Sequence, residues 1–95
     1  MDKNQIEQQG KITKLLEDLI NSHGVINQML KAIEELSELS RAISRLLITG
    51  NEKDSENVYE EIADVLIMLQ QLMIIHPKWE NQYYSKLKKL GLKLD

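Results

Sequence analysis

The stretch that decides the fold runs from Glu34 to Asp64, and it opens with Glu34-Glu35-Leu36-Ser37-Glu38 and closes with Glu61-Ile62-Ala63-Asp64. Both acidic motifs lie next to strongly apolar positions, and a polar segment separates them. A carboxylate without a partner is costly to hold beside a hydrophobic core. Because a divalent cation would compensate for that cost, the leading interpretation of the two motifs is a metal site.

Apolar residues on either side of the two motifs recur at helical spacing. This spacing predicts helices over residues 4–21, 25–49 and 56–75, and a last helix that begins at Pro77. The second of these helices carries a continuous apolar stripe, formed by Ile26, Met29, Ile33, Leu36, Leu39, Ile43 and Leu46. Gly24 and the segment 50–54 favour breaks between helices. The sequence therefore predicts an all-α fold, an antiparallel helical hairpin bundle of about four helices.

The length and composition predict a single domain over residues 1–95 that associates with copies of itself. A chain of this length buries roughly 60–70% of its unfolded surface, so its own core is modest. The segment Ile62–Leu69 has only one polar side chain, that of Asp64. A helix that is apolar on most of its circumference needs neighbours on several sides. We therefore expect a homodimer or homotetramer with the third helix near the interface.

Charge and residue usage argue against several classes of partner and site. The net charge of −3 argues against nucleic acid as the main partner. The absence of cysteine excludes disulfides and thiolate metal sites. The first residues have no apolar core of a secretory signal, and the longest apolar run, Val65–Leu69, is far shorter than the ~20 residues of a membrane span. We expect a soluble cytoplasmic protein that does not interact with membranes.

The spacing within each acidic motif places its carboxylates on one side of a helix. Residues i and i+3 lie about 60° apart around the helix axis, so Glu35 pairs with Glu38, and Glu61 pairs with Asp64. A short turn would make the two helices neighbours and bring the pairs together across a groove. Carboxylate oxygens are the ligands that Mg²⁺ and Mn²⁺ prefer. Solvated helix faces and structural ion pairs produce similar patterns, so the spacing alone leaves both interpretations open.

The two motifs, Glu-Glu-x-x-Glu followed by Glu-x-x-Asp, resemble the signature of the MazG-like all-α nucleoside triphosphate pyrophosphohydrolases. The segments 24–28 and 64–69 are also similar to that family, and the resemblance covers about residues 23–75. It implies Mg²⁺-dependent cleavage of a nucleoside triphosphate into a nucleoside monophosphate and pyrophosphate. It also implies four metal ligands, Glu35, Glu38, Glu61 and Asp64. Glu34 would orient the attacking water, add a further ligand or support the ligands from outside.

Other residues are weaker candidates for contact with a substrate. Lys31 precedes Glu35 by one turn and either contacts phosphate or, as we favour, pairs with Glu35. Gln28 shares that face and either touches the base or sugar or is a surface amide. The three aromatic residues of the last helix are expected in a core or interface in preference to a base-stacking role, namely Trp79, Tyr83 and Tyr84. Neither histidine is assigned a ligand role.

Two alternatives remain open at this point. Phosphoribosyl-ATP pyrophosphohydrolase belongs to the same superfamily, and it typically has a lysine-rich segment with glycine just before the paired glutamates. The corresponding segment here, Leu30-Lys31-Ala32-Ile33, departs from that pattern, which argues against this alternative. From a different class, the chain could be a helical interaction module without catalytic activity. Such a module would neither respond to Mg²⁺ nor release pyrophosphate.

Overall fold

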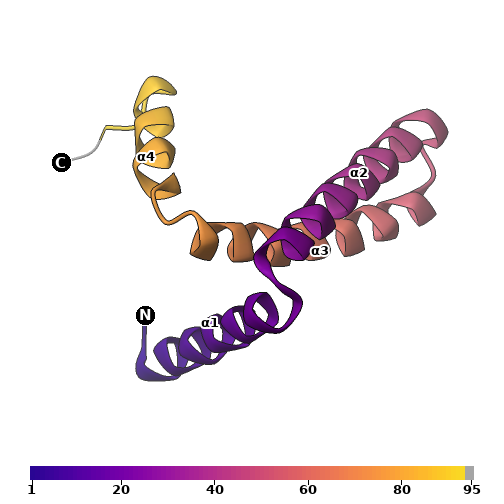
Figure 1. Cartoon of the computed structure of the whole chain (residues 1–95). Helices are drawn as coiled ribbons and strands as arrows, with labels where there is room; N and C mark the ends of the chain where they lie inside the picture. Colours follow the sequence, from indigo (N-terminus) through magenta and orange to yellow (C-terminus); the bar gives the residue numbers. More distant parts are fainter. Residues whose placement is uncertain (94–95) are drawn as a thin grey trace.

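Four α-helices and no strands make up residues 1–93, the part of the chain that the computed structural model describes (Figure 1). In chain order they are α1 (Lys3–His23), α2 (Val25–Thr49), α3 (Glu52–Ile75) and α4 (Trp79–Lys89). The prediction of an all-α chain with four helices is therefore confirmed. No helix among these residues is both long and apolar enough to cross a membrane.

Residues at the helix ends explain where the helices start and stop. Asp2 and Gln5 form a reciprocal capping box at the start of α1, which continues through Gly10. Gly24 and Gly50 end α1 and α2 with positive φ angles of 91° and 61°, a conformation that glycine adopts without steric cost. The predicted bounds of α2 are confirmed at both ends.

Two predicted helix starts were wrong. α3 begins at Glu52, four residues earlier than expected, because the side chain of Asn51 accepts a hydrogen bond from the N–H of Lys53 at 3.1 Å and caps the helix. α4 begins at Trp79, since Pro77 and Lys78 form a turn before it.

The helices α2 and α3 lie side by side along most of their length, and they position the acidic motifs (Figure 1). Helix α1 leaves this pair at Gly24 and packs only one end against it, and α4 stands apart beyond residue 76. The core is small and contains Leu16, Ile20, Ala32, Ala42, Val58, Val65 and Met68. The radius of gyration is 16.3 Å. A compact chain of this length would have a radius of about 12 Å.

The face of α2 that packs against α3 is not its most apolar face. Its buried positions are occupied by small or polar residues, namely Gln28, Ala32, Glu35 and Ala42. The apolar stripe is instead exposed at most of its positions, with Ile26 74% exposed and Ile33 61% exposed. On α3, Ile62 and Leu66 are each 50% exposed. The helix pair therefore has an exposed apolar flank (Met29, Ile33, Leu36, Ile43, Leu47, Ile62 and Leu66).

Candidate metal centre

Three carboxylates converge between α2 and α3. Glu35 and Glu38 extend from α2, and Glu61 reaches them from α3. Each offers one carboxylate oxygen, and these oxygens all lie within 4.8 Å of one another. The i, i+3 spacing on α2 supplies two of the three groups, and the contact between the helices supplies the third. The structure thus brings together three of the four predicted metal ligands.

Two oxygens of this cluster are buried without a partner. The Oε2 atoms of Glu35 and Glu61 accept no hydrogen bond from any residue in the described range 1–93. The Glu35 residue is only 9% exposed. Buried acceptors normally have a partner, and leaving a charged one unsatisfied is costly. An oxygen-seeking cation would remove this cost for both groups at once.

Lys31 forms the ion pair with Glu35 that the i, i+4 spacing predicts, at 3.7 Å between Nζ and Oε1. The lysine itself is exposed, whereas the Glu35 carboxylate is not. The pair neutralises part of the charge of Glu35 on its Oε1 side only. Its Oε2 atom stays buried without a donor.

The surroundings of Glu61 raise the pKa of its carboxyl. Burial raises the pKa of this carboxyl above its ordinary value, and the negative charges of Glu38, Asp64, Glu35 and Glu60 raise it further. Each of these causes penalises the ionised form. A bound divalent cation would act in the opposite direction, because it favours the carboxylate.

Asp64 and Glu34 lie outside the group of three. Asp64 is exposed on α3, although its charge is near enough to raise the pKa of Glu61. Glu34 is exposed on α2, next to Glu35 in the chain. Their roles as a metal ligand and as the water-orienting group stay predictions.

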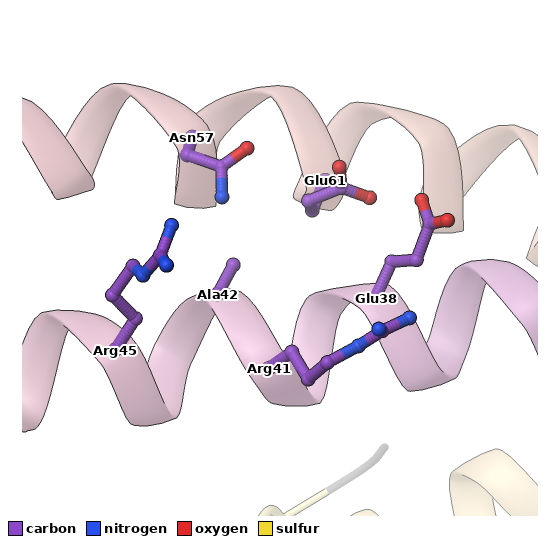
Figure 2. Close-up of a pocket in the computed structure, with 6 residues that line it drawn as sticks. All are labelled: Glu38, Arg41, Ala42, Arg45, Asn57 and Glu61. Carbon is purple, nitrogen blue, oxygen red and sulfur yellow. The ribbon is translucent and has the colours of Figure 1, made fainter.

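A groove of about 430 Å³ adjoins the carboxylates on the side toward the α2–α3 turn (Figure 2). Six residues line it, namely Glu38, Arg41, Ala42, Arg45, Asn57 and Glu61. Figure 2 shows the Glu38 carboxylate reaching from α2 toward Glu61, and the guanidinium group of Arg45 reaching toward Asn57 on α3. Cavities of this volume accommodate small ligands.

Sequence reasoning did not identify the two arginines or Asn57 as site residues. A signal was present, because Arg41 and Arg45 follow Glu38 by three and seven residues and so share its side of the helix. On α3, Asn57 precedes Glu61 by one turn. These spacings extend each acidic motif toward the turn that joins the helices.

A second cavity, of about 490 Å³, lies at the other end of the helix pair, where α1 leaves it. It brings together the two predicted substrate-binding residues, Gln28 and Lys31, with Gln71 and His23. Gln28 is not a surface amide, because it is buried and its Nε2 donates to the Oε1 of Gln71 at 2.7 Å. Gln71 is only 1% exposed. The pair of adjacent glutamines inside an otherwise apolar helix was the sequence signal for Gln71.

The aromatic residues of α4 do not take part in either cavity. The rings of Trp79 and Tyr83 are tilted at 57° with their centroids 5.8 Å apart, and the rings of Tyr83 and Tyr84 meet edge to face with centroids 5.6 Å apart. Both tyrosines are about half exposed, and α4 makes few contacts with the other helices. They are therefore not core residues within one chain, and their predicted role in an interface is untested.

The donor set fits a hard divalent cation. All three convergent groups are carboxylates, which suit Mg²⁺ or Mn²⁺ better than metals that prefer nitrogen or sulfur. Two of them have buried oxygens without a hydrogen-bond donor. Cationic side chains in the adjoining groove would accept an anion beside the metal.

No family of known proteins, no curated protein and no solved structure matches the chain. The resemblance to MazG-like pyrophosphohydrolases therefore stays a prediction from the two acidic motifs. The case for a function comes from the geometry of the carboxylates and the groove.

Proposed function

We propose that the protein is a Mg²⁺-dependent nucleoside triphosphate pyrophosphohydrolase, with Mn²⁺ as a possible substitute metal. The observation that carries this proposal is the pair of buried, unpartnered oxygens of Glu35 and Glu61 within a cluster of three carboxylates. A polyphosphate is a suitable substrate, because its oxygens bind the same type of cation. The resemblance of the acidic motifs to the MazG-like family supports the same reaction.

In this reaction, the oxygen of a water molecule attacks the α-phosphorus of the nucleoside triphosphate. The bond between the α-phosphorus and the bridging oxygen breaks, and pyrophosphate leaves with the electron pair. Glu34 is the proposed group that orients the water and takes its proton. When bound, Mg²⁺ would polarise the phosphate oxygens and neutralise charge that develops on them.

Glu35, Glu38 and Glu61 would hold the metal, with Asp64 as the proposed fourth ligand. Without the cation this cluster repels an anionic substrate, so metal and nucleotide are expected to bind together. Gln28 and Lys31 line the cavity beyond Glu35 and are the proposed contacts to the nucleoside and its α-phosphate. The ion pair with Glu35 limits the charge that Lys31 can offer.

The proposal includes a homodimer or homotetramer in which the exposed apolar flank of α2 and α3 packs against a second copy. Exposed side chains such as Ile33 and Leu66 support it, as does a radius of gyration of 16.3 Å, larger than a compact chain requires. The antiparallel hairpin bundle expected from the sequence would then be completed by helices of two chains.

The same flank favours a second candidate function, a non-catalytic helical interaction module. A module of this kind needs the apolar surface but gains nothing from unpartnered carboxylates in the groove. The two candidates therefore differ in their response to Mg²⁺.

A panel of nucleoside and deoxynucleoside triphosphates, together with phosphoribosyl-ATP, tests the proposal. Each substrate is incubated with the protein and Mg²⁺, and monophosphate, pyrophosphate and orthophosphate are quantified. We expect monophosphate and pyrophosphate in equal amounts, and we expect Glu38→Ala and Asp64→Ala to abolish turnover while Glu56→Gln retains it. Glu56 is an exposed residue of α3 outside the cluster.

Release of orthophosphate would reject cleavage between the α and β phosphates. Cleavage of phosphoribosyl-ATP alone would favour the alternative of a phosphoribosyl-ATP pyrophosphohydrolase. If no substrate is cleaved and Mg²⁺ has no effect on stability, the interaction module is the better description.

A further inference from the structure

We propose that Arg41 and Arg45, together with Asn57, form the binding site for the two terminal phosphates of the substrate, which leave as pyrophosphate. This inference rests on the proposed function and adds the direction in which the nucleotide lies along the helix pair. The nucleoside would lie toward α1, and the terminal phosphate would lie toward the turn between α2 and α3.

The first argument is the placement of the arginines. Arg41 and Arg45 are the only arginines among the 12 basic residues of the chain, and both line the groove beside the carboxylates. Their planar guanidinium groups match pairs of phosphate oxygens better than lysine does. The side-chain amide of Asn57 faces the same groove from α3 and offers two further donors (Figure 2).

The second argument is that the arginines do not neutralise the acids beside them. None of the ion pairs within residues 1–93 includes Arg41 or Arg45, although Glu38 and Glu61 line the same groove. Arg41 and Arg45 are four residues apart on α2, and like charges at this spacing repel and destabilise a helix. An anion held between the two guanidinium groups would reverse this repulsion.

The third argument is the order of groups along α2. Lys31, Glu38 and Arg45 are seven residues apart, which places them on one side of the helix. At 1.5 Å per residue, the position of Glu38 lies about 10 Å along the helix axis from that of Lys31 and from that of Arg45. Lys31 is already paired with Glu35, so the turn end of the groove offers more positive charge to a polyphosphate.

This direction of the nucleotide along the helix pair is consistent with the proposed cleavage at the α-phosphorus. When the terminal phosphates contact the arginines, the α-phosphate would lie beside the carboxylate cluster, whose side chains would hold the metal. The bond to the bridging oxygen breaks and pyrophosphate keeps the electron pair. The guanidinium groups would contact the terminal phosphates both in the bound triphosphate and in the leaving pyrophosphate.

Binding of inorganic pyrophosphate in the presence of Mg²⁺ tests the inference without requiring turnover. Isothermal titration compares wild type with Arg41→Gln, Arg45→Gln, the double variant and Arg45→Lys. Lys11→Gln is the matched control, because it removes one positive charge from an exposed position on α1. Circular dichroism checks that every variant retains its helical content.

We expect each single glutamine variant to bind pyrophosphate about 10-fold more weakly and the double variant about 100-fold more weakly, as for the loss of charge-assisted hydrogen bonds. The affinity of Arg45→Lys for pyrophosphate should be intermediate, because lysine keeps the positive charge but lacks the planar guanidinium group that donates two parallel hydrogen bonds. Nucleoside monophosphate should bind all variants as it binds wild type. Where turnover is measurable, KM for the triphosphate should rise more than kcat falls.

The outcomes separate this inference from the proposed function. Pyrophosphate binding that depends on the arginines, in a protein that cleaves no nucleotide, supports the subsite and rejects the enzyme. Unchanged KM and pyrophosphate affinity in an active double variant overturn the subsite and leave the enzyme standing. The subsite is also rejected if wild type binds no pyrophosphate, or if the arginine variants alter only the oligomeric state.

Discussion

Replacing Glu38 with Gln removes one charge from the carboxylate cluster while preserving the size of the side chain. Glu38 belongs both to the group of three carboxylates and to the adjoining groove. Without a divalent cation, the substitution reduces repulsion between Glu38 and Glu61, which is one cause of the raised pKa of Glu61. With Mg²⁺ present, it removes a ligand. The metal-free variant should therefore be at least as stable as metal-free wild type and should gain little from Mg²⁺.

The size of the effect follows from linkage between binding and folding. At a Mg²⁺ concentration of about ten times the dissociation constant, binding to the folded state alone adds about 1.4 kcal/mol to the free energy of unfolding. The unfolding entropy of a 95-residue chain is about 0.2 kcal/mol per kelvin, so Tm should rise by about 7 °C. If the variant binds about 100-fold more weakly, the same Mg²⁺ concentration should raise Tm by less than about 1 °C.

Thermal unfolding followed by circular dichroism provides the measurement, in MgCl₂ and in NaCl of equal ionic strength. Protein concentration is held constant, because association makes Tm depend on it. Glu56→Gln is the control for loss of one negative charge, since this exposed residue is not part of the cluster. An equal Mg²⁺-dependent rise in wild type and Glu38→Gln would refute the reasoning. The absence of any rise in wild type would refute the metal site itself.

Three further predictions concern packing, protonation and association. Gln71→Leu leaves the buried amide of Gln28 without its partner and should cost about 1–3 kcal/mol in urea unfolding, most of which a second substitution, Gln28→Leu, should recover. The folded state raises the pKa of Glu61 above its ordinary value of 4.5. Metal-free protein should therefore lose stability as the pH rises from 4.5 through the raised pKa. Urea titrations should show this pH dependence in wild type and not in Glu61→Gln. Ile33→Glu on the exposed apolar flank should shift the protein to a smaller assembly in analytical ultracentrifugation, whereas Ser37→Glu should not.

The sequence predicted the ends of a helix well where a single residue, such as a glycine, determines them. Gly24 and Gly50 are the residues that end α1 and α2, and the bounds of α2 follow from them. The start of α3 was less certain, because several polar residues near it could cap a helix. Asn51 does so, and α3 therefore begins four residues earlier than the sequence predicted. Capping depends on local geometry that composition does not specify.

The spacing of the acidic residues predicted most of the site. Periodicity placed Glu35 and Glu38 on one side of α2, and a short connection implied that Glu61 would face them. The orientation of α3 around its own axis could not be predicted, and it leaves Asp64 outside the group of three. The buried pair of Gln28 and Gln71 also depends on contact between helices, which pairwise spacing within one helix does not reveal.

The most apolar face of α2 did not become its buried face, and this links the site to assembly. Gln28, Ala32 and Glu35 occupy the contact with α3, where small and polar side chains let the helices approach and hold the carboxylates in the groove. The larger side chains, such as Ile33, are left in solvent. If the apolar stripe were turned toward α3 instead, Glu35 would leave the cluster. A second copy packed on the exposed flank would therefore stabilise the orientation of α2 that the metal site requires.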